Sequence, residues 1–264
     1  MVDAITYVTI SRPRRSNLSV KFERNDSIIC QCIGTSCHGT CNCVKSSQLR
    51  YTDKRLNVKA VEWSELGFES VQECSDMCTC HVNHCPNRLV QHGLQYRLEV
   101  FKKTTKKSEW GCRTRQRIQS GSFVIEMIGE IDTNQPTGIK LAELDGDTFV
   151  LDVVGATSNA SRLINHSCNA NLVMVPVFIE HHDHRCPNMA LFARRTIEPD
   201  EELTLDYGDE YWLATQNQLC QCNRSVDAVL TVLNFVLLAR TVVMKATRAR
   251  WLWRKLNESS NRIL

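Results

Sequence analysis

Two groups of cysteines in the first third of the chain have spacings suited to binding metal. The first group reads CxCxxxxCxxxCxC and the second reads CxxxCxCxxxxC. In an extended segment, residues two apart point to the same side, so both members of a CxC pair can reach one metal cluster. Spacing this regular favours metal ligation over ordinary buried cysteines. The nine residues are Cys30, Cys32, Cys37, Cys41, Cys43, Cys74, Cys78, Cys80 and Cys85.

The number of these cysteines predicts how the metal is bound. Structural zinc takes four ligands at about 2.3 Å, so separate sites would need multiples of four. Three zinc ions present twelve coordination positions, and nine thiolates fill them when three of the thiolates each bridge two ions. We therefore expect one trinuclear zinc cluster. We expect its role to be structural, because protein sulfur occupies every position and leaves none open to water or substrate.

The composition of the chain limits where such a cluster could work. The 264 residues contain 14 cysteines, which a secreted disulfide framework would also explain. Residues 1–29 lack the basic and then apolar stretches of a secretion signal, so the sequence favours a reducing, intracellular compartment. The longest apolar stretch, 226–243, is interrupted by polar residues and is shorter than the roughly 20 residues of a membrane span. We expect no contact with a membrane.

The charge of the chain does not by itself indicate a nucleic-acid binder. The formal net charge is only +3, although positive side chains gather at 12–15, 102–107 and 245–255. Each group has the composition of a solvated face. The alternative is contact with a nucleic-acid backbone, which salt would weaken.

Short β-branched runs bounded by turn residues follow the second cysteine group. They lie at 123–128, 148–152, 172–178, 189–193 and 203–207. Runs of this length and composition predict strands, so we expect a mostly β (α+β) fold. From Asp227 onward the apolar residues instead follow helical spacing.

Four segments of this β-rich region resemble the sequence motifs of SET domains. Residues 162–171 read RLINHSCNAN and are similar to RFINHSCxPN; residues 202–208 read ELTLDYG and are similar to ELTFDYG. Residues 109–112 read EWGC and are similar to GWGV; residues 123–130 read FVIEMIGE and are similar to GTFIxEYxGE. The nine cysteines and the CPNR sequence that ends them resemble the Pre-SET module of the subgroup that methylates lysine nine of histone H3.

This resemblance covers about residues 28–224 and implies both a fold and an activity. The implied fold is a SET domain of short strands, in which the NHSC and DY segments pass each other in a pseudoknot. The implied activity is that of a histone-lysine N-methyltransferase, which transfers methyl groups from S-adenosylmethionine to the H3 tail. The implied location is the nucleus, on chromosomes, with the nucleosome as partner.

The resemblance also assigns roles to individual residues. Tyr207 matches the catalytic tyrosine at the mouth of the family's lysine channel. In the family the Asn-His pair contacts the cofactor through backbone groups, and the Trp-Gly segment packs against it. The implied cofactor-binding residues are Trp110, Gly111, Arg162, Asn165 and His166.

A second zinc site of the family is only partly present. Its post-SET ligands are the cysteine of NHSC and a CxCxxxxC sequence, which correspond here to Cys168, Cys220 and Cys222, with Asp227 in the last position. A carboxylate can bind zinc, but replacing one sulfur of a four-thiolate site weakens it. We therefore expect at most one zinc ion here, in addition to the three of the Pre-SET module.

Aromatic positions depart from the family pattern as well. Leu205 stands where the family usually has Phe or Tyr, a position that influences how many methyl groups are added. On one alignment Phe149 replaces a cofactor-side tyrosine, and Ala156-Thr157 stand where two further tyrosines commonly occur. These departures leave an alternative open: a degenerate SET module that binds histone tails or chromatin partners without catalysis.

Two other interpretations have weaker support in the sequence. Residues 181–184 read HHDH and precede Cys186, which could suggest a metal site, but they fall between two expected strands and fit a solvated hairpin loop better. The second of these interpretations is a zinc-dependent DNA-binding protein, but the sequence lacks the recognition helix that such a protein would need.

The expected organisation is an N-terminal lead (1–27), a Pre-SET zinc-cluster module (28–93), a SET domain (94–212), a partial post-SET segment (213–227) and a divergent basic helical tail (228–264).

Overall fold

We analysed a computed structural model of the chain. It describes residues 12–13, 28–34, 37–57, 69–103, 109–133, 138–144, 146–154, 158–179, 186–208 and 211. The expected helical tail, the basic groups at 104–107 and 245–255, and Cys220, Cys222 and Asp227 lie outside these residues. In the described part, no helix is long and apolar enough to cross a membrane.

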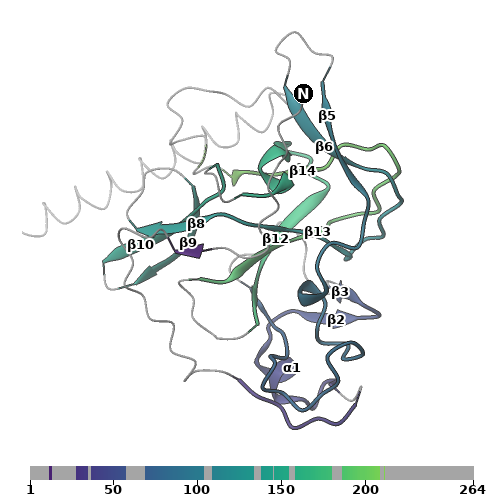
Figure 1. The fold of residues 1–264 in the computed structure, drawn as a ribbon, viewed down its shortest axis with the longest axis vertical. Helices are drawn as coiled ribbons and strands as arrows, with labels where there is room; N and C mark the ends of the chain where they lie inside the picture. Colours follow the sequence, from purple (N-terminus) through teal and green to yellow (C-terminus); the bar gives the residue numbers. More distant parts are fainter. Residues whose placement is uncertain are drawn as a thin grey trace, which may run out of the picture. The chain divides into compact units, whose positions relative to one another are not determined.

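A six-stranded sheet forms the centre of the β-rich region (Figure 1). Its order is β11-β14-β12-β13-β7, and β4 also pairs with β12. β13 is buried along nearly its whole length, which explains why its sequence is a continuous apolar run. The strands are β4 (Val71–Gln72), β7 (Phe123–Met127), β11 (Asn165–His166), β12 (Leu172–Phe178), β13 (Asn188–Ala193) and β14 (Thr204–Leu205).

A second sheet of four strands has the order β1-β8-β10-β9. Its strands are β1 (Arg12–Pro13), β8 (Glu130–Thr133), β9 (Ile139–Leu144) and β10 (Asp147–Asp152). Gly129 precedes β8 where the backbone of β10 passes close by, since a Cβ at this position would lie 2.1 Å from Asp152 O. Only glycine allows this approach.

Two antiparallel hairpins stand apart from these sheets. The first joins β5 (Leu98–Lys102) to β6 (Trp110–Thr114). The second joins β2 (Arg50–Thr52) to β3 (Arg55–Asn57). Between β2 and β3, Asp53 and Lys54 have φ of 51° and 58°. Positive φ at both central residues identifies the type I′ turn that matches the twist of a two-residue hairpin.

The cysteine-rich region has little regular structure of its own. It contains the short helix α1 (Asn42–Ser46) and a 3-10 turn, η3 (Val90–His92). β4 attaches it to the central sheet through Val71↔Val177 and Gln72↔Phe178. Its cysteines form a buried cluster separate from the two apolar cores.

The strands expected at 123–128, 148–152, 172–178 and 189–193 are confirmed as β7, β10, β12 and β13. The strand expected at 203–207 is shorter, because only Thr204–Leu205 pairs. The backbone N–H of Tyr207 is instead bonded to the side chain of His166. The mostly β architecture agrees with the prediction.

Candidate functional site

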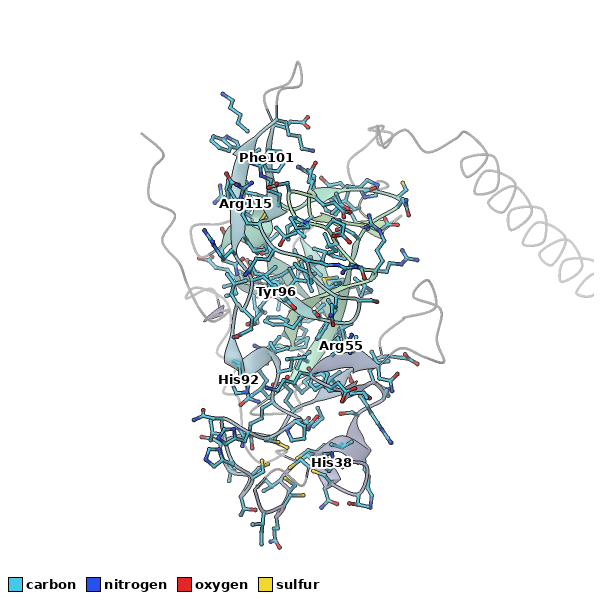
Figure 2. The ribbon with its side chains drawn as sticks, turned by 90° about the vertical axis from the view of Figure 1, so that its right-hand side faces the viewer. His38, Arg55, His92, Tyr96, Phe101 and Arg115 are labelled. Atoms are coloured by element: carbon cyan, nitrogen blue, oxygen red, sulfur yellow. The ribbon has the colours of Figure 1, made fainter. Side chains whose placement is uncertain are left out.

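All nine cysteines predicted to bind metal gather in one cluster, near the labelled His38 in Figure 2. Eight of them are buried, and Cys32 is partly buried. Neighbouring sulfur atoms are 3.7 Å apart between Cys30 and Cys37, 3.8 Å between Cys30 and Cys74, and 3.7 Å between Cys43 and Cys78. Two thiolates that share a tetrahedral zinc ion at about 2.3 Å lie about 3.8 Å apart. The observed spacings therefore fit zinc ligation.

Three sets of four sulfur atoms each lie within 4.8 Å of one another. The sets are Cys30, Cys41, Cys43 and Cys74; Cys30, Cys37, Cys74 and Cys80; and Cys30, Cys32, Cys37 and Cys41. Several cysteines occur in more than one set, and Cys30 occurs in all three. Shared sulfur is what a cluster with bridging thiolates requires.

Hydrogen-bond donors surround these sulfur atoms. Cys30 N is 3.4 Å from Cys78 Sγ, Asn87 Nδ2 is 3.5 Å from Cys74 Sγ, and Arg88 Nη2 is 3.6 Å from Cys80 Sγ. The pKa of the Cys30 thiol is raised far above its usual range, and burial is the largest cause. Without a cation this thiol keeps its proton, so metal binding would release protons.

A second group of predicted residues lies where two remote segments pair. β11 and β14 run parallel, with Asn165 opposite Thr204 and His166 opposite Leu205. β14 also pairs with β12. The segment just before Tyr207 therefore lies between β11 and β12, two strands that are close to each other in the sequence. The NHSC and DY segments are therefore side by side, as the resemblance implies.

Tyr207 contacts the backbone and the imidazole of this crossing. Its hydroxyl donates to Ile164 O at 2.6 Å, and its ring lies 5.3 Å from the His166 ring, edge to face. The ring of Tyr211 lies 4.8 Å away on a second side. Burial, with smaller effects of Tyr211 and Glu202, raises the pKa of Tyr207 to about 12. The phenol is therefore neutral at physiological pH.

His166 is held as a neutral imidazole. The backbone N–H of Tyr207 donates to His166 Nδ1 at 3.1 Å, so this nitrogen accepts and the ring hydrogen is on Nε2. Nε2 lies 3.2 Å from Cys168 Sγ. Burial lowers the pKa of His166, although the nearby Asp206 carboxylate opposes this shift. Among the expected post-SET ligands, Cys168 is the one that lies within the described residues, and its sulfur is next to this imidazole.

Trp110 and Gly111 lie beside Asn165. Asn165 Nδ2 donates to Trp110 O at 2.9 Å, while the Trp110 side chain is 43% exposed. A Cβ on Gly111 would lie 3.0 Å from the Phe101 ring and 3.1 Å from Glu202 Oε1, so a side chain here would have to displace these neighbours by a few tenths of an ångström. Phe101 is labelled on the same hairpin in Figure 2.

Arg162 differs from the other predicted residues. It lies on η4 (Ala160–Leu163), is exposed, and donates from Nη1 to Ser158 Oγ at 3.3 Å. Its described contact is thus within its own segment. Leu205 and Phe149 both lie in the apolar core, each 6% exposed.

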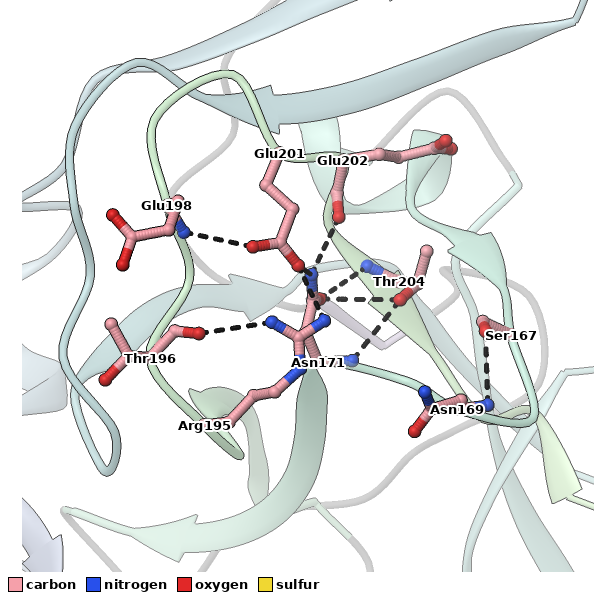
Figure 3. Close-up of polar contacts among 9 residues, drawn as sticks. All are labelled: Ser167, Asn169, Asn171, Arg195, Thr196, Glu198, Glu201, Glu202 and Thr204. Carbon is pink, nitrogen blue, oxygen red and sulfur yellow. Dashed lines mark hydrogen bonds and ion pairs between the residues drawn. The ribbon is translucent and has the colours of Figure 1, made fainter.

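Sequence reasoning missed a polar network around Asn171 (Figure 3). Asn171 Nδ2 donates to Glu201 Oε1 at 2.9 Å and to Glu202 O at 2.8 Å, and Asn171 Oδ1 accepts from Thr204 N at 2.9 Å. The side chain is 1% exposed. Asn171 is the last residue of the RLINHSCNAN motif, so its place in that motif was the available signal.

Comparison with known protein families identifies both the cysteine-rich region and the β-rich region that follows it. The family model for the SET domain matches residues 109–208, and the model for the Pre-SET motif matches residues 2–88. Together these matches contain all nine cysteines and the Asn165, His166 and Tyr207 motifs.

Several histone-lysine N-methyltransferases are similar in sequence. EHMT1 of Mus musculus is 34% identical over 205 residues, which are 74% of this chain and 15% of that protein. SETMAR of Homo sapiens is 37% identical over 202 residues, which are 69% of this chain and 28% of that protein. The chain thus spans only a minor part of these two curated relatives.

Solved structures are similar as well. The crystal structure of KRYPTONITE in complex with mCHH DNA, H3(1-15) peptide and SAH matches with a TM-score of 0.60 and 29% identity, over 83% of this chain and 43% of that one. The methyltransferase domain of human SETMAR matches with a TM-score of 0.57 and 29% identity, over 82% of this chain and 83% of that one. The chain therefore belongs to the SET-domain proteins, with a Pre-SET motif ahead of the SET domain.

Proposed function

We propose that this chain transfers methyl groups from S-adenosylmethionine to a lysine of the histone H3 tail, at position nine. The observation that carries the proposal is the position of the Tyr207 hydroxyl, fixed by Ile164 O and directly adjacent to the Asn165-His166 strand. Relatives that are similar over more than two thirds of this chain are histone-lysine N-methyltransferases. A similar structure was solved with an H3 peptide and SAH.

The proposed role of Tyr207 follows from its hydrogen bonding. S-adenosylmethionine supplies an electrophilic methyl group on a sulfonium. Because the Tyr207 hydroxyl gives its hydrogen to Ile164 O, the phenol oxygen keeps its lone pairs. Oxygen dipoles fixed in advance stabilise positive charge at the methyl group without competing as nucleophiles. With a pKa of about 12, the phenol does not ionise under assay conditions.

The remaining residues would hold the reactants in line. Trp110, Gly111, Asn165 and His166 bind the cofactor in this proposal, and Arg162 contributes from the adjoining turn. Holding an amine and a methyl group in near-attack geometry is worth about 7 to 11 kcal/mol in well-oriented systems. Burial of the substrate amine next to Leu205 lowers its pKa and raises the neutral, nucleophilic fraction.

We also propose that the nine cysteines bind three zinc ions. The shared sulfur atoms and the spacings of 3.7 and 3.8 Å support bridging thiolates. Cys168, with Cys220 and Cys222, would hold at most one more. The proposed location is the nucleus, on chromatin, where the basic groups at 12–15 and 102–107 would contact DNA backbone.

Methyl transfer from labelled S-adenosylmethionine to histone H3 tests the function. Wild type should label the tail, and Tyr207→Phe should lower the rate about a hundredfold or more while the cofactor product still binds by calorimetry. An H3 tail with lysine nine replaced by arginine should lose the label. A wild-type chain that transfers no label yet binds the H3 tail would instead support the non-catalytic module.

A further inference from the structure

One carboxylate joins three segments beside the proposed cofactor site. Glu202 Oε1 accepts from Lys103 Nζ at 2.6 Å and from Asn165 Nδ2 at 2.8 Å. Asn165 Nδ2 in turn donates to Trp110 O at 2.9 Å. The residue after β5 and the strand β11 therefore meet at a single oxygen atom from the loop before β14, and Asn165 extends the contact to the start of β6.

We infer that Lys103 is a positioning residue for the cofactor: through Glu202 it fixes the side chain of Asn165 and, with it, the backbone of β11. This inference rests on the proposed function, because the cofactor role of β11 is part of that proposal. The Lys103 and Glu202 side chains are only 20% and 28% exposed. Hydrogen bonds between charged groups in such partly enclosed sites are shorter and stronger than neutral ones.

The position of the Glu202 carboxylate is tightly limited. Its Oε1 lies 3.1 Å from where a Cβ of Gly111 would be, so it packs against the backbone of β6. Lys103 approaches it from an anchored backbone, because Lys103 N donates to Glu109 O at 2.7 Å. An ammonium held in this way leaves the carboxylate one preferred orientation, the orientation in which it accepts from Asn165.

Lys103 also offsets a charge that acts on the proposed catalytic residue. The negative charge of Glu202 contributes to the raised pKa of Tyr207, behind burial and Tyr211. It contributes in the same way, behind burial, to the raised pKa of Cys112. The Lys103 ammonium is the cation 2.6 Å from that carboxylate.

Binding of S-adenosylhomocysteine to the full chain, measured by calorimetry, tests this role without requiring turnover. Lys103→Met keeps the apolar stem and removes the charge, and should weaken binding about fivefold. Lys103→Arg keeps the charge and should bind within about twofold of wild type. Lys102→Met is the matched control in this measurement without DNA, since Lys102 is the exposed neighbour that makes no ion pair within the described residues, and the DNA contact proposed for 102–107 plays no part in binding S-adenosylhomocysteine. Lys103→Met binding as tightly as Lys102→Met would overturn the inference, as would Lys103→Arg binding as weakly as Lys103→Met.

A double substitution tests that Lys103 acts through Glu202. In a Glu202→Gln background, adding Lys103→Met should change binding by less than about twofold, because the shared interaction is already lost. A full additional loss would show that Lys103 acts by another route. If Glu202→Gln does not fold, the salt dependence of binding takes the place of the double substitution. Binding of S-adenosylhomocysteine should weaken with added salt in wild type, and should weaken less in Lys103→Met. Equal salt dependence of the two proteins would count against the inference.

The methyl-transfer assay separates this inference from the proposed function. If wild type transfers no label but binds S-adenosylhomocysteine and Lys103→Met weakens that binding, the function is wrong and the inference stands. If wild type is active and Lys103→Met matches Lys102→Met in binding and in KM for the cofactor, only the inference fails. If wild type does not bind S-adenosylhomocysteine, both fail.

Discussion

Glu126, a half-buried carboxyl group on β7, titrates near neutral pH. Its Oε1 accepts from Asn188 Nδ2 at 2.8 Å, and its backbone oxygen accepts from Asn159 Nδ2 at 2.8 Å. Burial raises the pKa of Glu126 to about 7; the charge of Glu73 adds to this shift and the Asn188 bond opposes it. The folded protein therefore holds a proton on Glu126 at a pH where the unfolded chain has lost it.

Replacing Glu126 by glutamine should stabilise the protein at high pH more than at low pH. The folded pKa lies above the unfolded value of about 4.3, so the contribution of Glu126 to stability is complete below about pH 4. It is lost as the pH rises through about 7, where a buried carboxylate must ionise. Thermal melts of Glu126→Gln and wild type should differ by a few degrees at about pH 8.5 and by less at about pH 5. An equal difference at both pH values would contradict the raised pKa.

At the scale of elements, the crossing of β11, β14 and β12 depends on one buried amide. Asn171 satisfies the carbonyl of Glu202 and the backbone N–H of Thr204 at the same time. It also binds Glu201, which pairs with Arg195 at 2.6 Å. The Asn171 amide supplies two N–H donors and an acceptor on a short stem, whereas a serine or threonine hydroxyl has only one donor.

Removing this amide should destabilise the fold strongly. Asn171→Ala leaves a buried carbonyl and a buried N–H without partners, each costing about 1 to 3 kcal/mol. The free energy of unfolding in denaturant should therefore fall by several times the effect of Asn169→Ala, an exposed asparagine two residues away. Similar values for the two variants would show that water or a rearranged loop replaces the Asn171 bonds.

The elements that could be predicted from the sequence share one property: their signal is local. β7, β12 and β13 are continuous β-branched and apolar runs, and the cysteine cluster follows from spacing within two short segments. The Lys103–Glu202 contact joins residues far apart in the chain, and neither belongs to a pattern that periodicity can detect. The shortened β14 has a similar cause, since a tertiary bond to His166 takes the Tyr207 N–H that a longer strand would use.

In the described residues taken together, β4 connects the cysteine cluster to the central sheet by strand pairing. Val71 and Gln72 pair with the end of β12, and Glu73 N donates to Phe178 O at 2.8 Å. The next residue is Cys74, one of the proposed zinc ligands. The proposed boundary between the Pre-SET module (28–93) and the SET domain (94–212) is therefore crossed by strand pairing.

Removing zinc should consequently loosen part of the SET domain as well. Metal-binding free energy is folding free energy for a site of this kind, so a chelator should speed hydrogen exchange across residues 69–75 and at Val177 and Phe178. The β5–β6 hairpin, which pairs within itself, should change less. Metal analysis of the released ions should give three from the cluster and at most one more. Faster exchange in the cysteine segments with no change at Val177 and Phe178 would show that β4 does not transmit the loss.

The presence of Cys30 in all three sulfur tetrads has a consequence for how the cluster assembles. A thiolate that two ions share must be ionised and in place for both, so the first ion that binds prepares the site of the next. Partly loaded forms are then scarce at equilibrium, and zinc titration should be steep and cooperative. By the same logic, alkylation of the Cys30 thiol would weaken binding at every ion that shares it.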